Sequence, residues 1–240
     1  MQFNFTIIIP VFNEEENLER LENELLKFTQ ISKAATKILF VNDGSTDKSQ
    51  IHIEAICQRN PDFNYLLFDK NYGLSAALKA GFDYADTALV GYIDADLQTS
   101  PSDFCILLEH ISDYELITGV RTNRNDNFVK KVSSKLANGI RRVFTKDGME
   151  DTGCPLKIIK TEYAKRIPMF KGLHRFLPAM ILLQGGRIKQ IPVQHFPRVA
   201  GTSKFGIGNR LLGPLTDCFA YVWMKKKAIN YKVSKQKFTP

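Results

Sequence analysis

Two aspartates one residue apart form the pattern in this sequence that is best suited to chemistry. Asp94 and Asp96 follow residues 88–93, an apolar run that predicts a buried strand. Residues two apart on a strand point to the same side, so we expect both carboxylates to face one cleft. Two negative charges this close raise the pKa of one carboxyl unless a cation separates them. These oxygens, with Gln98 as a third ligand, suit Mg²⁺ or Mn²⁺, although a lone D-x-D also occurs as a solvated surface turn.

Motifs of several other enzyme classes are missing from the sequence. The four histidines have no zinc-site spacing, and the four cysteines lie far apart without a C-x-x-C pair. There is no Walker glycine loop, no G-x-G-x-x-G after the first predicted strand and no G-x-S-x-G. These absences argue against a phosphate-loop enzyme, a dinucleotide-dependent dehydrogenase and a disulfide framework.

Alternating strands and helices are predicted to position the two aspartates. Residues 5–12, 37–42, 65–68 and 88–93 are rich in β-formers. Apolar residues at helical spacing follow the first, third and fourth runs, and a turn with a plausible helix cap follows the second. A fifth strand is expected at 116–120. This order predicts an α/β fold, with a mostly parallel central sheet and helices on both faces. Polar residues end the first four strands, at 13–14, 42–43, 69–71 and 94–96, and we expect them to converge at the carboxyl edge of the sheet.

Composition and charge limit the chain's class and partners. Its 240 residues, 44% apolar and 24% charged, predict one globular domain with a small appendage, and no apolar run reaches the roughly 20 residues that span a bilayer. No secretory signal is recognised, so a cytoplasmic chain is expected. Residues 1–120 hold 8 Lys and Arg against 19 Asp and Glu, whereas residues 121–240 hold 25 against 6. The basic half suits nucleic acid, anionic lipid or phosphorylated ligands, unless the two halves simply neutralise each other.

Four motifs occur in the order and spacing of inverting family 2 glycosyltransferases. They are PVFNEE at 10–15, VNDGSTD at 41–47, GLSAA at 73–77 with AGF at 80–82, and DADLQ at 94–98. The chain most resembles the branch that includes dolichol-phosphate mannosyltransferases and undecaprenyl-phosphate sugar transferases, over roughly residues 4–210. The resemblance implies a GT-A-type (Rossmann-like) domain at 1–210 and a basic, acceptor- or membrane-facing extension at 211–240.

The resemblance also implies which residues hold the donor, a UDP or GDP sugar. Its binding residues are expected to be Pro10, Phe12, Glu14, Asp43, Gly73 and Asp94. Asp94, Asp96 and Gln98 are expected to hold Mg²⁺ or Mn²⁺ on the diphosphate, with Asp96 a catalytic residue. Related chains often carry a Lys or Arg shortly before the glycine of the third motif, whereas here Asn71 and Tyr72 precede Gly73, with Lys70 close by.

Acceptor residues are implied in the basic half. Residues 150–157 resemble the family's next motif, whose aspartate lies beside the acceptor, so we expect a catalytic role for Asp151; the alternative is a turn aspartate before a glycine. The lipid phosphate is expected at Arg121, Arg124 and Lys131, the last on a predicted helix at 127–144 whose basic stripe could equally be a solvated face. Arg198 and Lys204 belong to residues 198–205, which resemble a mobile loop over the phosphates.

Residues 211–224 are apolar and aromatic and end in three lysines, 225–227. This pattern is typical of a helix lying on an anionic membrane, and equally of a core helix with a charged end. We therefore expect a cytoplasmic enzyme, peripheral on the cytoplasmic membrane face, alone or with an integral-membrane partner or as a homo-oligomer, and without nucleic acid.

Three functions fit the sequence. The first is metal-dependent inverting sugar transfer to a polyprenyl phosphate, and the second is transfer to a hydroxyl of a glycan or lipopolysaccharide. The third is a non-catalytic module that binds nucleotide sugars. Arg121 and Arg124 with Asp151 favour the first over the second, and the intact D-x-D disfavours the third. Uridine is the preferred base, with guanosine next.

Overall fold

A seven-stranded sheet forms the centre of the part of the chain that the structure, a computed structural model, describes: residues 4–122, 139, 141–197, 212–229, 235 and 237. The strand order is β3-β2-β1-β4-β6-β5-β7. The strands are β1 (Phe5–Val11), β2 (Thr36–Asn42), β3 (Phe63–Leu67), β4 (Leu89–Tyr92), β5 (Leu116–Arg121), β6 (Lys157–Lys160) and β7 (Ile188–Val193). β1 to β4 are parallel, β6 is antiparallel to both β4 and β5, and β7 is parallel to β5.

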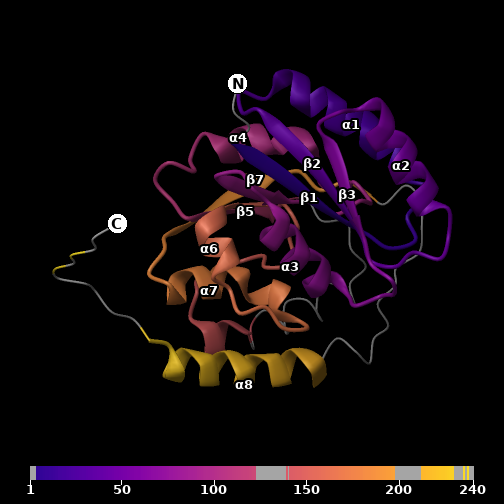
Figure 1. Cartoon of the computed structure of the whole chain (residues 1–240). Helices are drawn as coiled ribbons and strands as arrows, with labels where there is room; N and C mark the ends of the chain where they lie inside the picture. The colour runs from indigo at the N-terminus through magenta and orange to yellow at the C-terminus, as the bar shows by residue number, and fades with distance from the viewer. Residues whose placement is uncertain are drawn as a thin grey trace.

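Helices cover both faces of this sheet, as predicted (Figure 1). On one face, α1 (Leu18–Ile31), α2 (Ser49–Arg59) and α4 (Phe104–Leu108) enclose one apolar cluster. On the other, α3 (Leu74–Tyr84), α6 (Thr161–Lys165), α7 (Leu177–Leu183) and α8 (Leu212–Lys227) enclose a second. Short 3₁₀ turns, η1 (Pro101–Asp103) and η2 (Leu173–Phe176), precede α4 and α7. Both faces of the central strands are therefore buried, which explains their continuous apolar sequences.

The five predicted strands are confirmed, with ends that move by one or two residues. Ser100 caps η1, since its Oγ accepts a bond from Ser102 N at 3.2 Å, but the helix that follows has only five residues. β6 and β7 were not predicted. Of the helix expected at 127–144, Gly139 and residues 141–144 are described and helical, and the rest lies outside the described part. The domain boundary at 210 also falls outside the described residues and stays a prediction.

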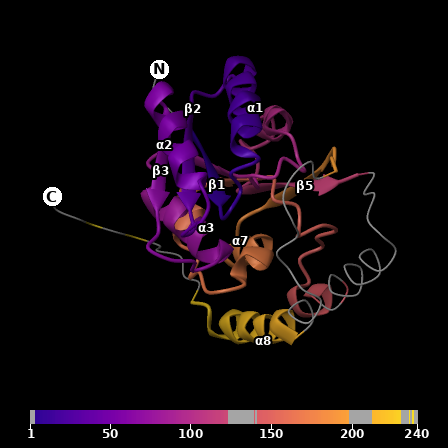
Figure 2. The same cartoon turned by 90° about the vertical axis from the view of Figure 1, so that its right-hand side faces the viewer.

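α8 lies beside α7, on the side remote from α1 and α2 (Figure 1 and Figure 2). Its Cys218 and Tyr221 are buried in the second cluster, and the Tyr221 ring stacks on Phe176 with centroids 5.9 Å apart. Phe219 and Trp223 remain 63% exposed. The helix therefore has a packed inner face and an apolar outer face. Among the described helices, none is long and apolar enough to cross a membrane.

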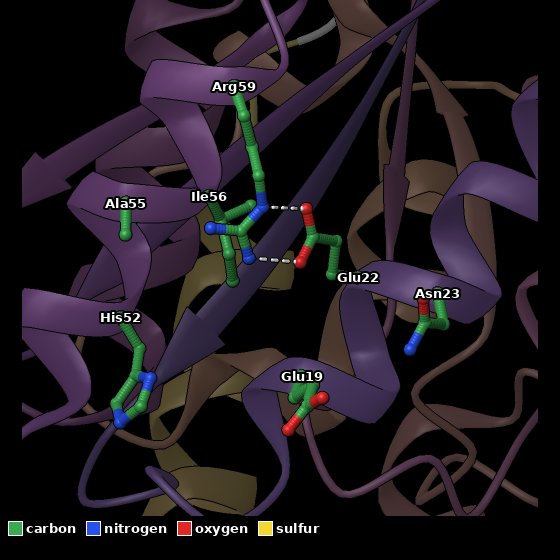
Figure 3. Close-up of a pocket in the computed structure, with 7 residues that line it drawn as sticks. All are labelled: Glu19, Glu22, Asn23, His52, Ala55, Ile56 and Arg59. Carbon is green, nitrogen blue, oxygen red and sulfur yellow. Dashed lines mark hydrogen bonds and ion pairs between the residues drawn. The ribbon is translucent and has the colours of Figure 1, made fainter.

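An ion pair fastens α1 to α2 at a shallow cavity of about 220 Å³ (Figure 3). Both carboxylate oxygens of Glu22 accept from the Arg59 guanidinium, and Asn60 Nδ2 donates to the same carboxylate at 2.7 Å. The bonds from Arg59 hold the pKa of Glu22 below its usual value of 4.5, although burial opposes them. The cavity contains none of the predicted site residues, and its buried carboxylate is already paired, so the pair serves the fold.

We expect Glu22→Gln to lower the free energy of unfolding at pH 7 by about 1–3 kcal/mol, because charge-assisted hydrogen bonds are lost. The folded-state pKa of Glu22 is lowered, so its stabilisation is present above about pH 4.5 and disappears as the pH falls through the folded pKa. Urea unfolding at pH 7 and at about pH 3 measures the difference at both ends of this range.

Glu24→Gln is the matched control, since Glu24 pairs with Lys27 on the same helix with side chains 30% and 66% exposed. Its loss should stay below about 0.5 kcal/mol. Equal losses in the two variants, or a Glu22→Gln effect that does not shrink in acid, would contradict the expectation.

Candidate active site

The D-x-D motif lies in a turn and not on a strand. β4 ends at Tyr92, so Asp94 and Asp96 follow it, and the strand alternation that we invoked does not place them. Leu97 adopts a left-handed φ of 53°, and Gln98 N donates to Asp96 Oδ1 at 3.2 Å. The turn itself holds the two carboxylates near each other, at the carboxyl edge of the sheet. Asp96 is 5% exposed and Asp94 is half-buried.

The two aspartates carry an excess of negative charge. Burial, and then the charge of Asp96, raises the pKa of Asp94 to about 6. Tyr92 Oη donates to Asp94 Oδ1 at 2.8 Å, and the positive charges of Lys157 and Arg121 oppose the rise. The available donors are all oxygen atoms, which fits Mg²⁺ or Mn²⁺. The described residues contain no group of three His, Cys, Asp or Glu able to hold a metal, so a cation here needs Gln98 or substrate oxygens as further ligands.

Lys157 is a buried cation behind this turn, and sequence reasoning gave it no role. It begins β6 opposite Tyr92 of β4, and its Nζ lies 5.9 Å from the centroid of the Tyr92 ring. Nζ donates to the carbonyls of Cys154 and Thr152, the latter at 3.4 Å. Burial lowers the pKa of Lys157 below its ordinary value. A single lysine within the apolar run 156–159 was the available signal, because a buried lysine must be compensated.

Arg121 and Asp151, predicted to act on different groups, form one ion pair. Arg121 Nε donates to Asp151 Oδ2 at 2.7 Å and Nη2 donates to Oδ1 at 2.9 Å, while the Arg121 backbone N–H reaches Oδ2 at 3.3 Å. Burial lowers the pKa of Arg121, but the bonds from Asp151 outweigh it and the pKa is raised. The pair fixes the end of β5 to the turn at 150–153 and leaves Nη1 of Arg121 without an acceptor among the described residues. The other predicted acceptor residues, Arg124, Lys131, Arg198 and Lys204, lie outside the described part of the chain.

Asp43 organises the loop that leads into α3. Its Oδ1 accepts from Tyr72 N at 2.7 Å, and its Oδ2 accepts from Gly73 N at 2.8 Å and from Asn71 Nδ2 at 3.0 Å. Gly73 has a φ of 92°, a conformation that side chains rarely adopt. Burial raises the pKa of Asp43, and the two backbone N–H groups counteract it. Asn71 thus contacts Asp43 near the position where related chains often carry a cation.

The ends of β1 and β2 are tied together beside Asp43. Asn13 Oδ1 accepts from Thr46 N at 2.8 Å, and Ser49 Oγ accepts from Glu14 N at 3.0 Å. Pro10 pairs with Val41 in the sheet, Phe12 is half-buried, and Glu14 Oε2 accepts from Asn17 Nδ2 at 2.6 Å. Because β1 lies between β2 and β4, residues 10–14, Asp43 and the D-x-D turn occupy neighbouring strand ends. The predicted convergence of the polar strand ends is confirmed for these three, and Asn71, which follows β3, also reaches Asp43.

A segment from the far end of the chain also reaches the D-x-D turn. The carbonyl of Gln98 accepts from Phe196 N at 2.9 Å and contacts His195 Nδ1 at 3.1 Å. Both residues follow β7, ninety-seven and more positions along the chain from Gln98. No local signal marked His195, because the contact depends on the position of β7 at the sheet edge.

Comparison with known proteins identifies the family to which this chain belongs. The chain matches the Glycosyl transferase family 2 domain over residues 6–167. It is 30% identical over 229 residues to a dodecaprenyl-phosphate galacturonate synthase of Rhizobium johnstonii, covering 93% of this chain and 68% of the relative. It is 34% identical over 205 residues to an undecaprenyl-phosphate 4-deoxy-4-formamido-L-arabinose transferase of Pectobacterium carotovorum, covering 84% of this chain and 62% of that protein. The chain thus spans about two thirds of the length of these relatives.

A solved structure with a similar fold is a glucosyl-3-phosphoglycerate synthase from Mycobacterium tuberculosis in complex with Mn²⁺, UDP and glucosyl-3-phosphoglycerate. The TM-score is 0.71 at 13% identity, covering 99% of this chain and 85% of that one. At this identity the similarity concerns the fold alone, and it confirms the predicted GT-A-type architecture.

We expect Asp151→Asn and Arg121→Gln each to lower the free energy of unfolding by about 2–4 kcal/mol, because each leaves a buried charge without its partner. The double variant should lose less than the sum, by at least about 1 kcal/mol, since the second change removes the uncompensated charge. Urea unfolding of the four proteins measures this coupling.

The exposed Lys79–Asp83 pair on α3 provides the control cycle, with side chains 46% and 43% exposed. Its coupling should stay below about 0.5 kcal/mol. Additive losses at Arg121 and Asp151 would show that the two side chains do not interact in solution.

Proposed function

Because the chain belongs to glycosyl transferase family 2, we propose that it transfers a sugar from a nucleotide-diphospho-sugar to a polyprenyl phosphate, with inversion at the anomeric carbon. One observation carries the proposal: the acidic D-x-D turn and the Arg121–Asp151 pair lie at the same sheet edge, with Lys157 between them. The names of the relatives support a polyprenyl-phosphate acceptor.

The donor would bind along the ends of β1, β2 and β4. Pro10, Phe12 and Glu14 with Asp43 would receive the nucleoside, and the loop at Gly73 would close the site beside Asp43. Asp94, Asp96 and Gln98 would hold Mg²⁺ or Mn²⁺, which when bound supplies neutralisation of the charge on the departing diphosphate. The UDP and Mn²⁺ in the similar solved structure support this choice of donor and cation.

The acceptor would approach from the side of β5 and β6. One oxygen of the lipid phosphate attacks the anomeric carbon from the face opposite the diphosphate, a new C–O bond forms, and the diphosphate leaves with the electron pair of the broken bond. A phosphate monoester is largely ionised at neutral pH, so it needs positioning more than proton removal. Arg121 would hold the phosphate through Nη1, and Asp151 would keep the guanidinium oriented.

A hydroxyl acceptor is the alternative, and it would require a general base. Asp151 is the candidate for that role, but both of its carboxylate oxygens already accept from Arg121. This engagement suits positioning better than proton removal, which favours the phosphate acceptor.

We expect radiolabelled UDP- or GDP-sugars, a short polyprenyl phosphate and Mg²⁺ or Mn²⁺ to yield butanol-extractable label. Asp96→Asn should reduce the rate by at least about 100-fold, because the charge of the leaving group is no longer compensated. Asp86→Asn, which alters an exposed pair with Lys37, should leave the rate unchanged.

The Asp151→Asn variant should keep a measurable rate with a lipid-phosphate acceptor. With a hydroxyl acceptor, the same variant should lose nearly all of its rate. Label in an aqueous glycan would favour the hydroxyl acceptor, and donor binding without turnover would favour the non-catalytic module.

The outer face of α8 supports a second part of the proposal, in which the protein meets its lipid acceptor at an anionic membrane surface. Phe219 and Trp223 expose apolar rings on this helix, and Lys225, Lys226 and Lys227 are exposed in its last turn. Apolar side chains beside a basic cluster complement anionic headgroups over acyl chains. The protein would act as a peripheral protein on the cytoplasmic membrane face.

Trp223 is the single tryptophan of the chain and so reports on this face alone. Its emission should shift to shorter wavelength with phosphatidylglycerol vesicles but not with phosphatidylcholine vesicles, and added salt should weaken the shift. Changing lysines 225–227 to Gln should abolish it, whereas the same change at the exposed Lys27, Lys33 and Lys165 should not. No shift on anionic vesicles, or a shift that survives loss of the first three lysines, would overturn this part of the proposal.

A further inference from the structure

The turn at 172–175 contacts the first turn of α3, close to residues 71–73, which we call the donor loop. Ser75, the second residue of α3, is buried, and its Oγ accepts from Gly172 N at 3.1 Å. The same Oγ lies 2.8 Å from His174 Nδ1, and His174 N–H makes a longer contact at 3.5 Å. One hydroxyl therefore joins two segments that are almost a hundred residues apart.

These contacts favour one tautomer of the imidazole. Because Ser75 Oγ accepts from backbone N–H groups, we expect it to donate its own proton to His174 Nδ1, which leaves the ring proton on Nε2. Burial, and then the charges of Arg175 and Lys157, lowers the pKa of His174 to about 3. The ring is thus a neutral acceptor for Ser75 at any working pH, and the bond does not depend on protonation changes.

The opposite side of the same turn rests on α8. Gly172 has a φ of 96°, and a Cβ at this position would fall on the Asp217 carboxylate. Arg175 Nη1 lies 3.7 Å from Asp217 Oδ2. The turn that carries His174 is therefore held between α8 and α3.

The connection continues from Ser75 to the donor loop. Gly73 lies two residues before Ser75, and its N–H, with that of Tyr72, donates to Asp43. A shift of the first turn of α3 would move these two N–H groups. The contact between His174 and Ser75 can therefore influence how the N–H groups of residues 72 and 73 meet Asp43, although neither His174 nor Ser75 lies at a strand end.

We propose that His174 is a positioning residue of the donor site, which through Ser75 holds the first turn of α3 and so sets the 71–73 loop against Asp43. This inference rests on the proposed function, since it takes Asp43 and Gly73 to contact the nucleotide. Neither His174 nor Ser75 belongs to the residues that sequence reasoning placed in the site.

The test compares full-length wild type with Ser75→Ala, His174→Ala and the double variant. Titration calorimetry with UDP and with GDP, each with Mn²⁺, should show affinity reduced about tenfold in either single variant, the effect of one lost hydrogen bond. The double variant should bind no more weakly than the weaker single one, because both changes break the same contact. In the transfer assay, KM for the donor should rise while kcat and KM for the acceptor stay within about twofold.

Two further variants separate positioning from general stability. His174→Asn offers Ser75 a carbonyl acceptor and should recover most of the nucleotide affinity that His174→Ala loses. His52→Ala, at an exposed position on α2, should leave the nucleotide affinity unchanged. Nitrogen NMR of the wild-type His174 imidazole should show the Nε2–H tautomer, and Ser75→Ala should remove the preference for this tautomer.

The outcomes distinguish the two proposals. If wild type binds neither UDP nor GDP, the proposed function is wrong and the inference falls with it. If wild type binds one of them and the Ser75 and His174 variants bind it equally well, the inference alone is overturned. The inference is also overturned if the variants lose kcat, affinity for the acceptor and thermal stability together with affinity for the donor. An imidazole that carries its proton on Nδ1 in the wild type overturns it as well.

Discussion

Compensation of buried negative charge is the constraint on which the site depends. Asp94, Asp96 and Asp151 gather at one edge of the sheet, where Asp96 and Asp151 are nearly inaccessible to solvent. Carboxylates removed from water cost several kcal/mol each unless cations and hydrogen bonds replace the water. Arg121 compensates Asp151 directly, and Lys157 lowers the pKa of Asp94 from behind. The remaining excess charge at the D-x-D turn is the basis for the proposed binding of a divalent cation at this edge.

The sheet topology supplies both compensating cations. β6 is inserted antiparallel between β4 and β5, which places Lys157 opposite Tyr92 and next to Thr118 of β5. The same insertion brings the 150–153 turn to the end of β5, where Arg121 meets Asp151. An entirely parallel sheet would send the strand after β5 in the other direction and separate these groups. The antiparallel strand therefore brings the D-x-D turn and the Arg121–Asp151 pair, the proposed donor and acceptor sides, to one edge of the sheet.

Within the described residues, the two halves of the chain meet along the strand pairs of β6 and β7 with β4 and β5, in two shared apolar clusters, and through polar contacts such as the ion pairs of Glu115 with Lys160 and Arg187. Asp43 and Asn13 tie the loops of the acidic half to one another, while Ser75 and His174 tie α3 of that half to the basic half. α8 lies at the end of this sequence of contacts, with Asp217 facing the 172–175 turn and Phe219 and Trp223 facing outward. α8 thus lies between the surface proposed to meet lipid and the elements that frame the proposed donor site.

Local patterns were sufficient for the first four strands, the helices between them and the D-x-D motif, because apolar periodicity and polar strand ends are properties of short segments. β6 was missed since four residues that begin and end with lysine carry no such pattern, and β7 was missed for lack of a comparable apolar run. The residues of the 10–15, 41–47 and 94–98 motifs were named from the sequence as candidates for the site, and so were Arg121 and Asp151 as separate groups.

The sequence by itself determined β1 to β5 and the helices between them, and it supplied the carboxylates and basic side chains on which the proposed phosphate and metal site rests. Only the tertiary structure decided that Arg121 and Asp151 neutralise each other, that Lys157 lies behind Tyr92, and that His174 holds Ser75. These contacts join residues between thirty and ninety-nine positions apart, or depend on which strands are neighbours. Periodicity reports the environment of a residue along its own element, whereas an ion pair or a buried hydrogen bond depends on the element packed against it.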